Sequence, residues 1–110
     1  MRIQKLKENR EFRRAYNRGK VFVTPFAVIY VTKNRTGDVR LGITAGKKVG
    51  KAVKRNRCRR IIREAFRGLL PEVKRGYDYV FVARAATVNK KSTDMAHIMR
   101  AQLKSIGHLQ

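Results

Sequence analysis

Residues 51–69, KAVKRNRCRRIIREAFRGL, carry the most regular pattern in the chain. Their apolar members recur at i, i+3, i+4, i+7, i+8 and i+11, namely Cys58, Ile61, Ile62, Ala65, Phe66 and Leu69. This spacing places them along one side of an α-helix. The polar residues on roughly the opposite side are Asn56, Arg60, Arg63 and Arg67. The pattern predicts an amphipathic helix that ends before Pro71, with one buried face and one basic face.

Two further helices are predicted at the ends of the chain. The first covers residues 10–18, with Asn9 as its N-cap and Gly19 as a left-handed residue at its C-terminus. The last helix is expected to begin at a Ser92 cap and to end at Gly107.

β-Branched and aromatic residues predict four strands, at 21–23, 26–32, 39–45 and 79–83. The expected order is therefore α-β-β-β-α-β-α. Such an order indicates an α+β sandwich with one mixed four-stranded sheet. With 110 residues, we expect a single domain over residues 1–110.

The charge is extreme, because 28 Lys and Arg residues face seven Asp and Glu residues, for a formal net charge of +21. Self-repulsion on this scale favours a polyanionic partner, of which nucleic acid is the foremost example. A membrane surface is disfavoured because the chain has no Trp and no helix that pairs a basic face with an aromatic one. One cysteine, no bilayer-length apolar run and no signal-peptide pattern lead us to expect a cytoplasmic protein.

Basic residues are densest between positions 47 and 67, where only Glu64 opposes them. With Asn56, which can donate to and accept from a base edge, the candidate RNA-binding residues are Lys47, Lys48, Lys51, Lys54, Arg55, Arg57, Arg59, Arg60, Arg63 and Arg67. A solvated helix face is the alternative. Solvated faces usually mix charges at i, i+4, whereas Lys51 with Arg55 and Arg59 with Arg63 repeat one sign. We therefore favour a phosphate-binding face.

Aromatic residues concentrate in the first third of the chain, where they could stack on bases or fill the core. Tyr16 and Tyr30 are the better candidates for a cleft, because their hydroxyl groups need water or a partner. In the strand at 39–45, Arg40, Gly42 and Thr44 share one face. These residues are small or basic, which suits a face approached by a ligand.

The search for catalytic groups is negative. His97 and His108 stand alone, and Cys58 lies on the apolar stripe, where a thiol is usually inert. The acidic residues are too few and too scattered for a metal site or an acid–base pair. The polypeptide alone is not expected to be a nuclease.

Residues 47–60, KKVGKAVKRNRCRR, resemble the signature K-K-x-G-x-A-V-x-R-N-R-x-[KR]-R of the protein subunit of bacterial ribonuclease P at every position. Residues 6–12 resemble that family's opening helix. Residues 41–45 resemble the strand before the signature, although Gly46 stands where serine is common. The likeness covers about residues 5–85 well and the last helix loosely.

The resemblance implies a left-handed βαβ crossover, against the usual rule. It also implies that the ribonuclease P RNA, with Mg²⁺ bound by that RNA, cleaves precursor tRNA at its mature 5′ end. The protein, which we expect to be monomeric within the ribonucleoprotein, would bind the catalytic RNA through the basic residues of 47–67. The residues expected in a cleft for the 5′ leader are Phe12, Tyr16, Tyr30, Arg40 and Thr44.

Two other functions remain open from the sequence. A ribosomal protein or general RNA chaperone of similar fold would have the same composition, and a small basic DNA-binding protein is a more distant alternative.

Overall fold

The computed structural model describes residues 4–24 and 26–109. Its sheet has five strands in the order β1-β4-β5-β3-β2. Their bounds are β1 Gln4–Lys5, β2 Lys20–Val23, β3 Ala27–Lys33, β4 Arg40–Thr44 and β5 Tyr77–Ala83. The helices are α1 Asn9–Arg18, α2 Ala52–Leu69 and α3 Ser92–Ser105, with short 3₁₀ turns at η1 Lys47–Val49, η2 Leu70–Glu72 and η3 Ala85–Asn89.

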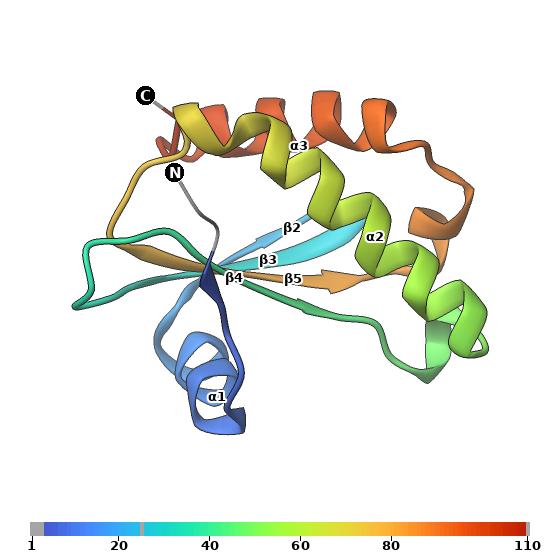
Figure 1. Ribbon diagram of the computed structural model, residues 1–110, viewed down its shortest axis with the longest axis horizontal. Helices are drawn as coiled ribbons and strands as arrows, with labels where there is room; N and C mark the ends of the chain where they lie inside the picture. The colour runs from blue at the N-terminus through green and yellow to red at the C-terminus, as the bar shows by residue number, and fades with distance from the viewer. Residues whose placement is uncertain (1–3, 25, 110) are drawn as a thin grey trace.

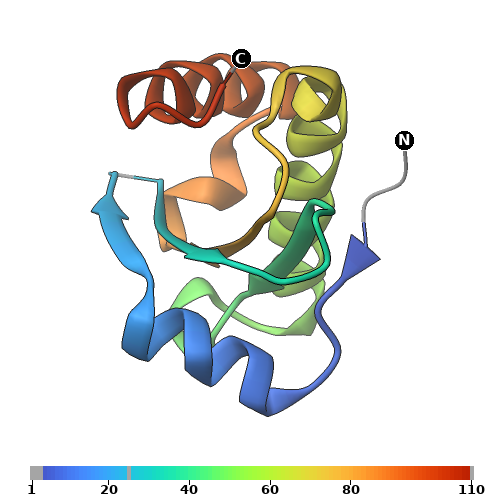
Figure 2. The same ribbon diagram turned by 90° about the vertical axis from the view of Figure 1, so that its left-hand side faces the viewer.

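The helices cover the two faces of the sheet unequally. α2 and α3 lie on one face, and α1 alone lies on the other (Figures 1 and 2). All six residues of the stripe predicted for α2 are buried, which confirms that helix and its inward face. Phe66 packs against the rings of Tyr79 and Phe81 of β5, with ring centroids 5.6 and 5.7 Å apart. The main core therefore lies between α2, α3 and the sheet.

The β4–α2–β5 connection is left-handed. β4 and β5 are parallel neighbours, with Leu41 paired to Tyr79. In Figure 1 the chain runs left to right along β4, returns above the sheet along α2, and enters β5 behind β4. Seen in this view, the chain turns counter-clockwise while it moves away from the viewer. That is a left-handed crossover, opposite to the right-handed connection found in most proteins. The α+β class, the crossover and the four predicted strands are confirmed, but the sheet has a fifth strand, β1, so the expected count of four is wrong.

The additional strand, β1, pairs in parallel with the edge of β4 through Gln4 and Lys5. Both residues are exposed, so their polar side chains gave no strand pattern. The pairing instead comes from backbone groups: the Gln4 N–H donates to the Val39 carbonyl at 3.2 Å, and the Leu6 N–H to that of Leu41 at 3.0 Å.

Three of the expected helix caps are wrong. Glu8, not Asn9, precedes α1, and its N–H donates to the Glu11 carboxylate at 3.0 Å. Gly19 is extended rather than left-handed; glycine is needed there because a Cβ would lie 2.4 Å from the Ala15 carbonyl oxygen. Lys91, without a side-chain bond, takes the place expected for Ser92. Each error came from assigning a cap by residue type, and at Gly19 the proximity of β3 also could not be known from the sequence.

The end of α3 is as expected. Gly107 has φ 79°, and its N–H donates to the Lys104 carbonyl. The His108 N–H donates to the Leu103 carbonyl at 2.8 Å, which completes a Schellman motif.

Gly42 lies beneath Phe12, so the expectation that its face of β4 is open to a ligand is wrong at this position. A Cβ on Gly42 would lie 2.6 Å from Cε1 of Phe12. Phe12 belongs with Leu6, Ala15 and Val80 to a small second core under α1. The absence of a side chain at position 42 lets the aromatic ring reach the sheet.

We expect Gly42→Ala to lower the free energy of unfolding by about 1–3 kcal/mol, because the added methyl group overpacks this contact. Urea denaturation measures the change. Gly68→Ala is the matched control: a Cβ on Gly68, within α2, meets nothing within 4 Å. That substitution should stabilise the chain by about 0.4–1 kcal/mol. Equal stability of the Gly42 variant and the wild type would contradict the close contact.

Candidate RNA interface

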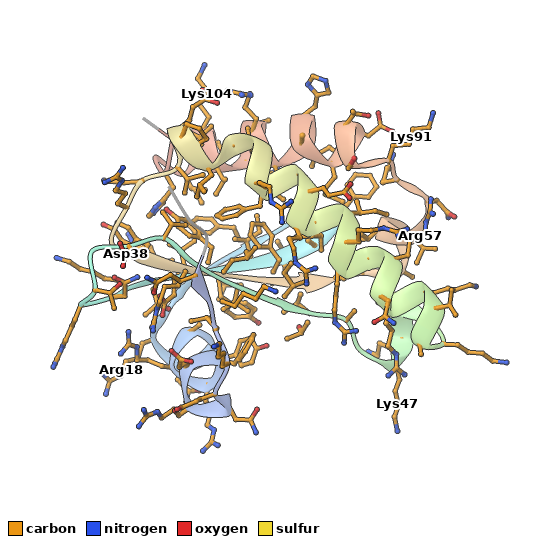
Figure 3. All side chains as sticks on the ribbon, viewed as in Figure 1. Arg18, Asp38, Lys47, Arg57, Lys91 and Lys104 are labelled. Atoms are coloured by element: carbon orange, nitrogen blue, oxygen red, sulfur yellow. The ribbon has the colours of Figure 1, made fainter. Side chains whose placement is uncertain are left out.

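The eleven candidate residues of positions 47–67 all lie on η1, on α2 or on the segment between them. We call them the α2 basic face. Most are exposed, while Arg55, Arg59 and Arg63 are half-buried. Lys47 and Arg57 mark its beginning in Figure 3, where they lie at the end of the molecule at which α2 starts. The structure therefore brings the predicted residues together on one connected segment.

Three arginines of this face are each held in place by one hydrogen bond, which a single nitrogen of the guanidinium donates. Arg55 Nε donates to the Gly50 carbonyl at 2.8 Å, and Arg57 Nε donates to the Val88 carbonyl at 3.1 Å. Arg59 Nη1 donates to the Asn56 side-chain oxygen at 2.9 Å. Each guanidinium keeps further N–H groups that can bind a phosphate. The arrangement reduces the side-chain entropy lost when a ligand binds.

The anchoring carbonyls could not be found by sequence reasoning. Gly50 has φ 137°, a conformation that favours glycine, and this turn brings its carbonyl beside α2. Val88 belongs to η3, which is 31 residues from Arg57 along the chain. The glycine in the signature is the one available signal; nothing in the sequence points to Val88.

A second candidate surface is the part of the sheet beside α1 that this helix leaves uncovered. Tyr30 of β3 lies there, with its ring 4.9 Å from that of Tyr16 in an edge-on arrangement. Val21 pairs with Tyr30 across β2 and β3, and Val23 pairs with Val28. Paired residues, and residues two apart along a strand, lie on the same face of a sheet, so Val21, Val23 and Val28 share the face of Tyr30. Tyr16 is 38% exposed, Val21 48% and Val23 68%.

We call this surface the open sheet face. Its members are Tyr16, Val21, Val23, Val28, Tyr30, Thr44 and Val82; Val28 and Thr44 both pair with Val82. The two tyrosines and Thr44 were predicted from the sequence as site residues, whereas the four valines were not. The β-branched runs that contain these valines predicted the strands. Which side of the strands is exposed can be seen only when the strand register and the area covered by α1 are known.

Arg40 does not contribute a free guanidinium to the open sheet face. Its Nε and Nη2 donate to the Asp78 carboxylate at 2.6 and 2.7 Å, and its Nη1 donates to Glu11 at 2.7 Å. Asp78 is 1% exposed and also accepts a hydrogen bond from Asn34 at 2.9 Å. The bond to Asp78 raises the pKa of Arg40. Arg40 therefore ties α1 to β4 and β5.

Other chemistry-bearing groups are engaged in the fold. Cys58 is buried, and burial raises the pKa of its thiol. His108 Nδ1 lies 3.1 Å from the Tyr79 hydroxyl, and burial lowers its pKa. Within residues 4–24 and 26–109, no three His, Cys, Asp or Glu side chains form a group that could hold a metal. The acidic side chains, several of them already paired with arginine, do not fit a catalytic cation.

No helix in the described part of the chain is long and apolar enough to cross a membrane. A strongly basic helix face and an open, partly aromatic sheet face are typical of proteins that bind nucleic acid. The fold and the site thus define a small α+β nucleic-acid-binding protein with a left-handed crossover.

Comparison with known proteins agrees with this class. The family model described as Ribonuclease P matches residues 1–107. A ribonuclease P protein component from Clostridium botulinum (strain 657 / Type Ba4) is 43% identical over 108 residues, which cover 97% of each chain. One from Clostridioides difficile is 44% identical over 95 residues, covering 86% of this chain and 83% of the relative.

Solved structures extend the likeness. The Staphylococcus aureus RNase P protein superposes with a TM-score of 0.86 at 27% identity, covering 99% of this chain and all of that one. The Thermotoga maritima protein gives 0.82 at 27% identity over 93% and 96% of the chains. The chain belongs to the ribonuclease P protein family, whose members are the protein component of a ribonucleoprotein endoribonuclease.

Proposed function

We propose that the α2 basic face binds the catalytic RNA of ribonuclease P and that the open sheet face holds the single-stranded 5′ leader of precursor tRNA. The RNA, with Mg²⁺ bound to it, would carry out the cleavage. One copy of the protein would act in each ribonucleoprotein, in the cytoplasm. The observation that carries the proposal is the set of anchored arginines, which present free N–H groups on a face with almost no counter-charge.

The division of labour follows from the chemistry of the two surfaces. The α2 basic face offers charge and bidentate donors, which suit the phosphates of a structured RNA. The open sheet face offers tyrosine rings and valines, which suit unpaired bases more than phosphates. Arg40 serves the second surface indirectly, because it fixes α1, which carries Tyr16, to the sheet.

A reconstituted cleavage assay tests the function as a whole. The purified chain alone should leave precursor tRNA intact, whereas a mixture with the catalytic RNA should cleave it at a low Mg²⁺ concentration at which the RNA alone is slow. A polylysine of similar charge serves as the control for nonspecific neutralisation. If polylysine supported cleavage equally, the chain would be acting as a general RNA chaperone, and the proposal would be wrong.

Tyr30→Ala tests the assignment of the open sheet face. Loss of one stacked base costs roughly 1–3 kcal/mol, so the assembled complex should bind precursor tRNA about 5- to 150-fold more weakly. Affinity for mature tRNA, which has no leader, should be unchanged. Tyr30→Phe is the matched control: it keeps the ring and should keep most of the affinity. Equal losses for precursor and mature tRNA would show that Tyr30 does not contact the leader.

A further inference from the structure

The outer side of α1 carries four arginines: Arg10, Arg13, Arg14 and Arg18. We call them the α1 arginine face. At 100° per residue, Arg10, Arg13 and Asn17 lie on the side away from Ala15, which is buried against the sheet, and Arg14 and Arg18 flank that side. Arg10, Arg13 and Arg18 are exposed, and Arg14 is half-buried. This face is separate from every surface used in the proposed function.

These arginines form few ion pairs or hydrogen bonds within the described part of the protein. Arg10 pairs with Glu8, and Arg14 Nη2 lies 3.4 Å from the Lys33 carbonyl oxygen and 3.8 Å from Asp78. Neither Arg13 nor Arg18 has an ion-pair or hydrogen-bond partner among residues 4–24 and 26–109. The carboxylate of Glu11, on the same helix, is bound by Arg40 and by the N–H groups of Lys7 and Glu8.

The spacing of the arginines opposes helix stability. Arg10 with Arg14, and Arg14 with Arg18, place like charges at i, i+4, where each pair costs a few tenths of a kcal/mol. A solvated face would be better served by alternating charges. Four guanidinium groups within one ten-residue helix instead present bidentate donors for phosphates.

The geometry excludes the bases bound on the open sheet face as the ligand. A helix with its side chains is about 10–12 Å across, so α1 stands between its outer side and any strand on the sheet. The start of the α2 basic face is also distant: Arg18 and Lys47 lie at opposite ends below the sheet in Figure 3. The α1 arginine face would therefore contact a different part of the RNA.

We propose that the α1 arginine face is an additional RNA-binding surface that takes the phosphodiester backbone of a helical RNA segment. No aromatic side chain lies among its arginines, so it would bind phosphate without reading bases. We assign this segment to the catalytic RNA, because the family is the protein component of a ribonucleoprotein. The proposal rests on the chain working with RNA, and not on the assignments of the α2 basic face or the open sheet face.

The test compares two double variants that remove the same charge. Arg13→Gln with Arg18→Gln removes the unpaired arginines of the α1 arginine face. Lys91→Gln with Lys104→Gln removes two exposed cations beside and within α3, on the far side of the sheet (Figure 3). Affinity for the catalytic RNA is measured across a salt series with each protein. Affinities of the reconstituted complexes for precursor and mature tRNA are measured in the same way.

For the RNA that the face contacts, the arginine variant should reduce the salt slope, d log K/d log[salt], by about 1.4–1.8, since each phosphate contributes roughly 0.7–0.9. Its affinity at low salt should fall at least about tenfold, and the lysine control should change neither quantity. A change with the catalytic RNA is the expected result. A change with precursor and mature tRNA alike, but not with the catalytic RNA, would place the segment in the tRNA body and overturn the proposal.

Three further results would overturn the proposal: unchanged slopes for all RNAs, equal changes in the lysine control, or a loss confined to precursor tRNA. The last would make the face part of leader binding. Urea midpoints equal to that of the wild type show that the variants fold, as expected for exposed side chains. If Arg57→Ala kept full affinity for the catalytic RNA while the arginine variant lost it, the role of the α2 basic face would fail and this inference would stand.

Discussion

Arg40→Ala is expected to lower the free energy of unfolding by about 3–5 kcal/mol, because it leaves the buried carboxylate of Asp78 without its main cation. Asp78 would keep the bond from Asn34 and a distant Arg14. Urea denaturation of the purified chain gives the change. Adding Asp78→Asn to this variant should restore part of the loss, since an amide needs no cation.

Arg100→Ala is the matched control for this experiment. Arg100 also forms a two-bond pair with a carboxylate, that of Glu72, at 2.8 and 2.6 Å, but both side chains are exposed. Solvent screens such a pair, so its loss should leave the stability close to that of the wild type. If the two variants lost the same stability, the burial of Asp78 would not be the cause.

The cost of Arg40→Ala should depend on pH. The backbone N–H of Glu8, and to a lesser degree Arg40, lower the pKa of Glu11 in the folded chain. A lowered pKa stabilises the fold above the ordinary value for glutamate, and this contribution is lost as the pH falls through the lowered value. The difference between wild type and variant should therefore shrink in acid.

Arg57→Ala should weaken assembly with the catalytic RNA by about 30-fold or more, in the range of an interface hot spot of 2 kcal/mol. The substitution removes a guanidinium that the Val88 carbonyl already orients. Arg57→Lys is the control that keeps the charge but loses the fork, and it should recover only part of the affinity. Filter binding or fluorescence titration at fixed salt measures both variants.

Salt should act on the same equilibrium even more strongly. If the α2 basic face makes about 6–10 phosphate contacts, affinity should fall by roughly 10³–10⁵ between 50 and 200 mM salt. Arg57→Ala should reduce the slope by about one contact. Unchanged affinity of Arg57→Ala at physiological salt would count against the proposed role of this residue.

The sequence allowed good predictions where the determinants are local. The stripe on α2 repeats every 3.6 residues, so its six buried residues were identified correctly. Four of the five strands were predicted within two residues at each end, because β-branched runs mark them. The signature at 47–60 led to the left-handed crossover through family resemblance, which periodicity could not have done.

The missed features depend on pairing between distant parts of the chain. Arg40 and Asp78 are neighbours across β4 and β5 although 38 residues separate them in the sequence. The structural role of Arg40, which was predicted to contact a ligand, could therefore be recognised only from the register of these two strands. The valines of the open sheet face became visible only with the strand pairing and the position of α1. β1 depends almost wholly on backbone bonds to a partner strand.

The internal use of the acidic side chains has a consequence for the speed of assembly. Of the seven acidic residues, five bond to other side chains: Glu8, Glu11, Asp38, Glu72 and Asp78. The outward electric field is therefore positive over most directions of approach. Such a field accelerates diffusional encounter with a polyanion toward the 10⁸–10⁹ M⁻¹s⁻¹ range at low salt. Encounter with RNA should be fast from almost any orientation, while the close contacts govern how long the complex lasts.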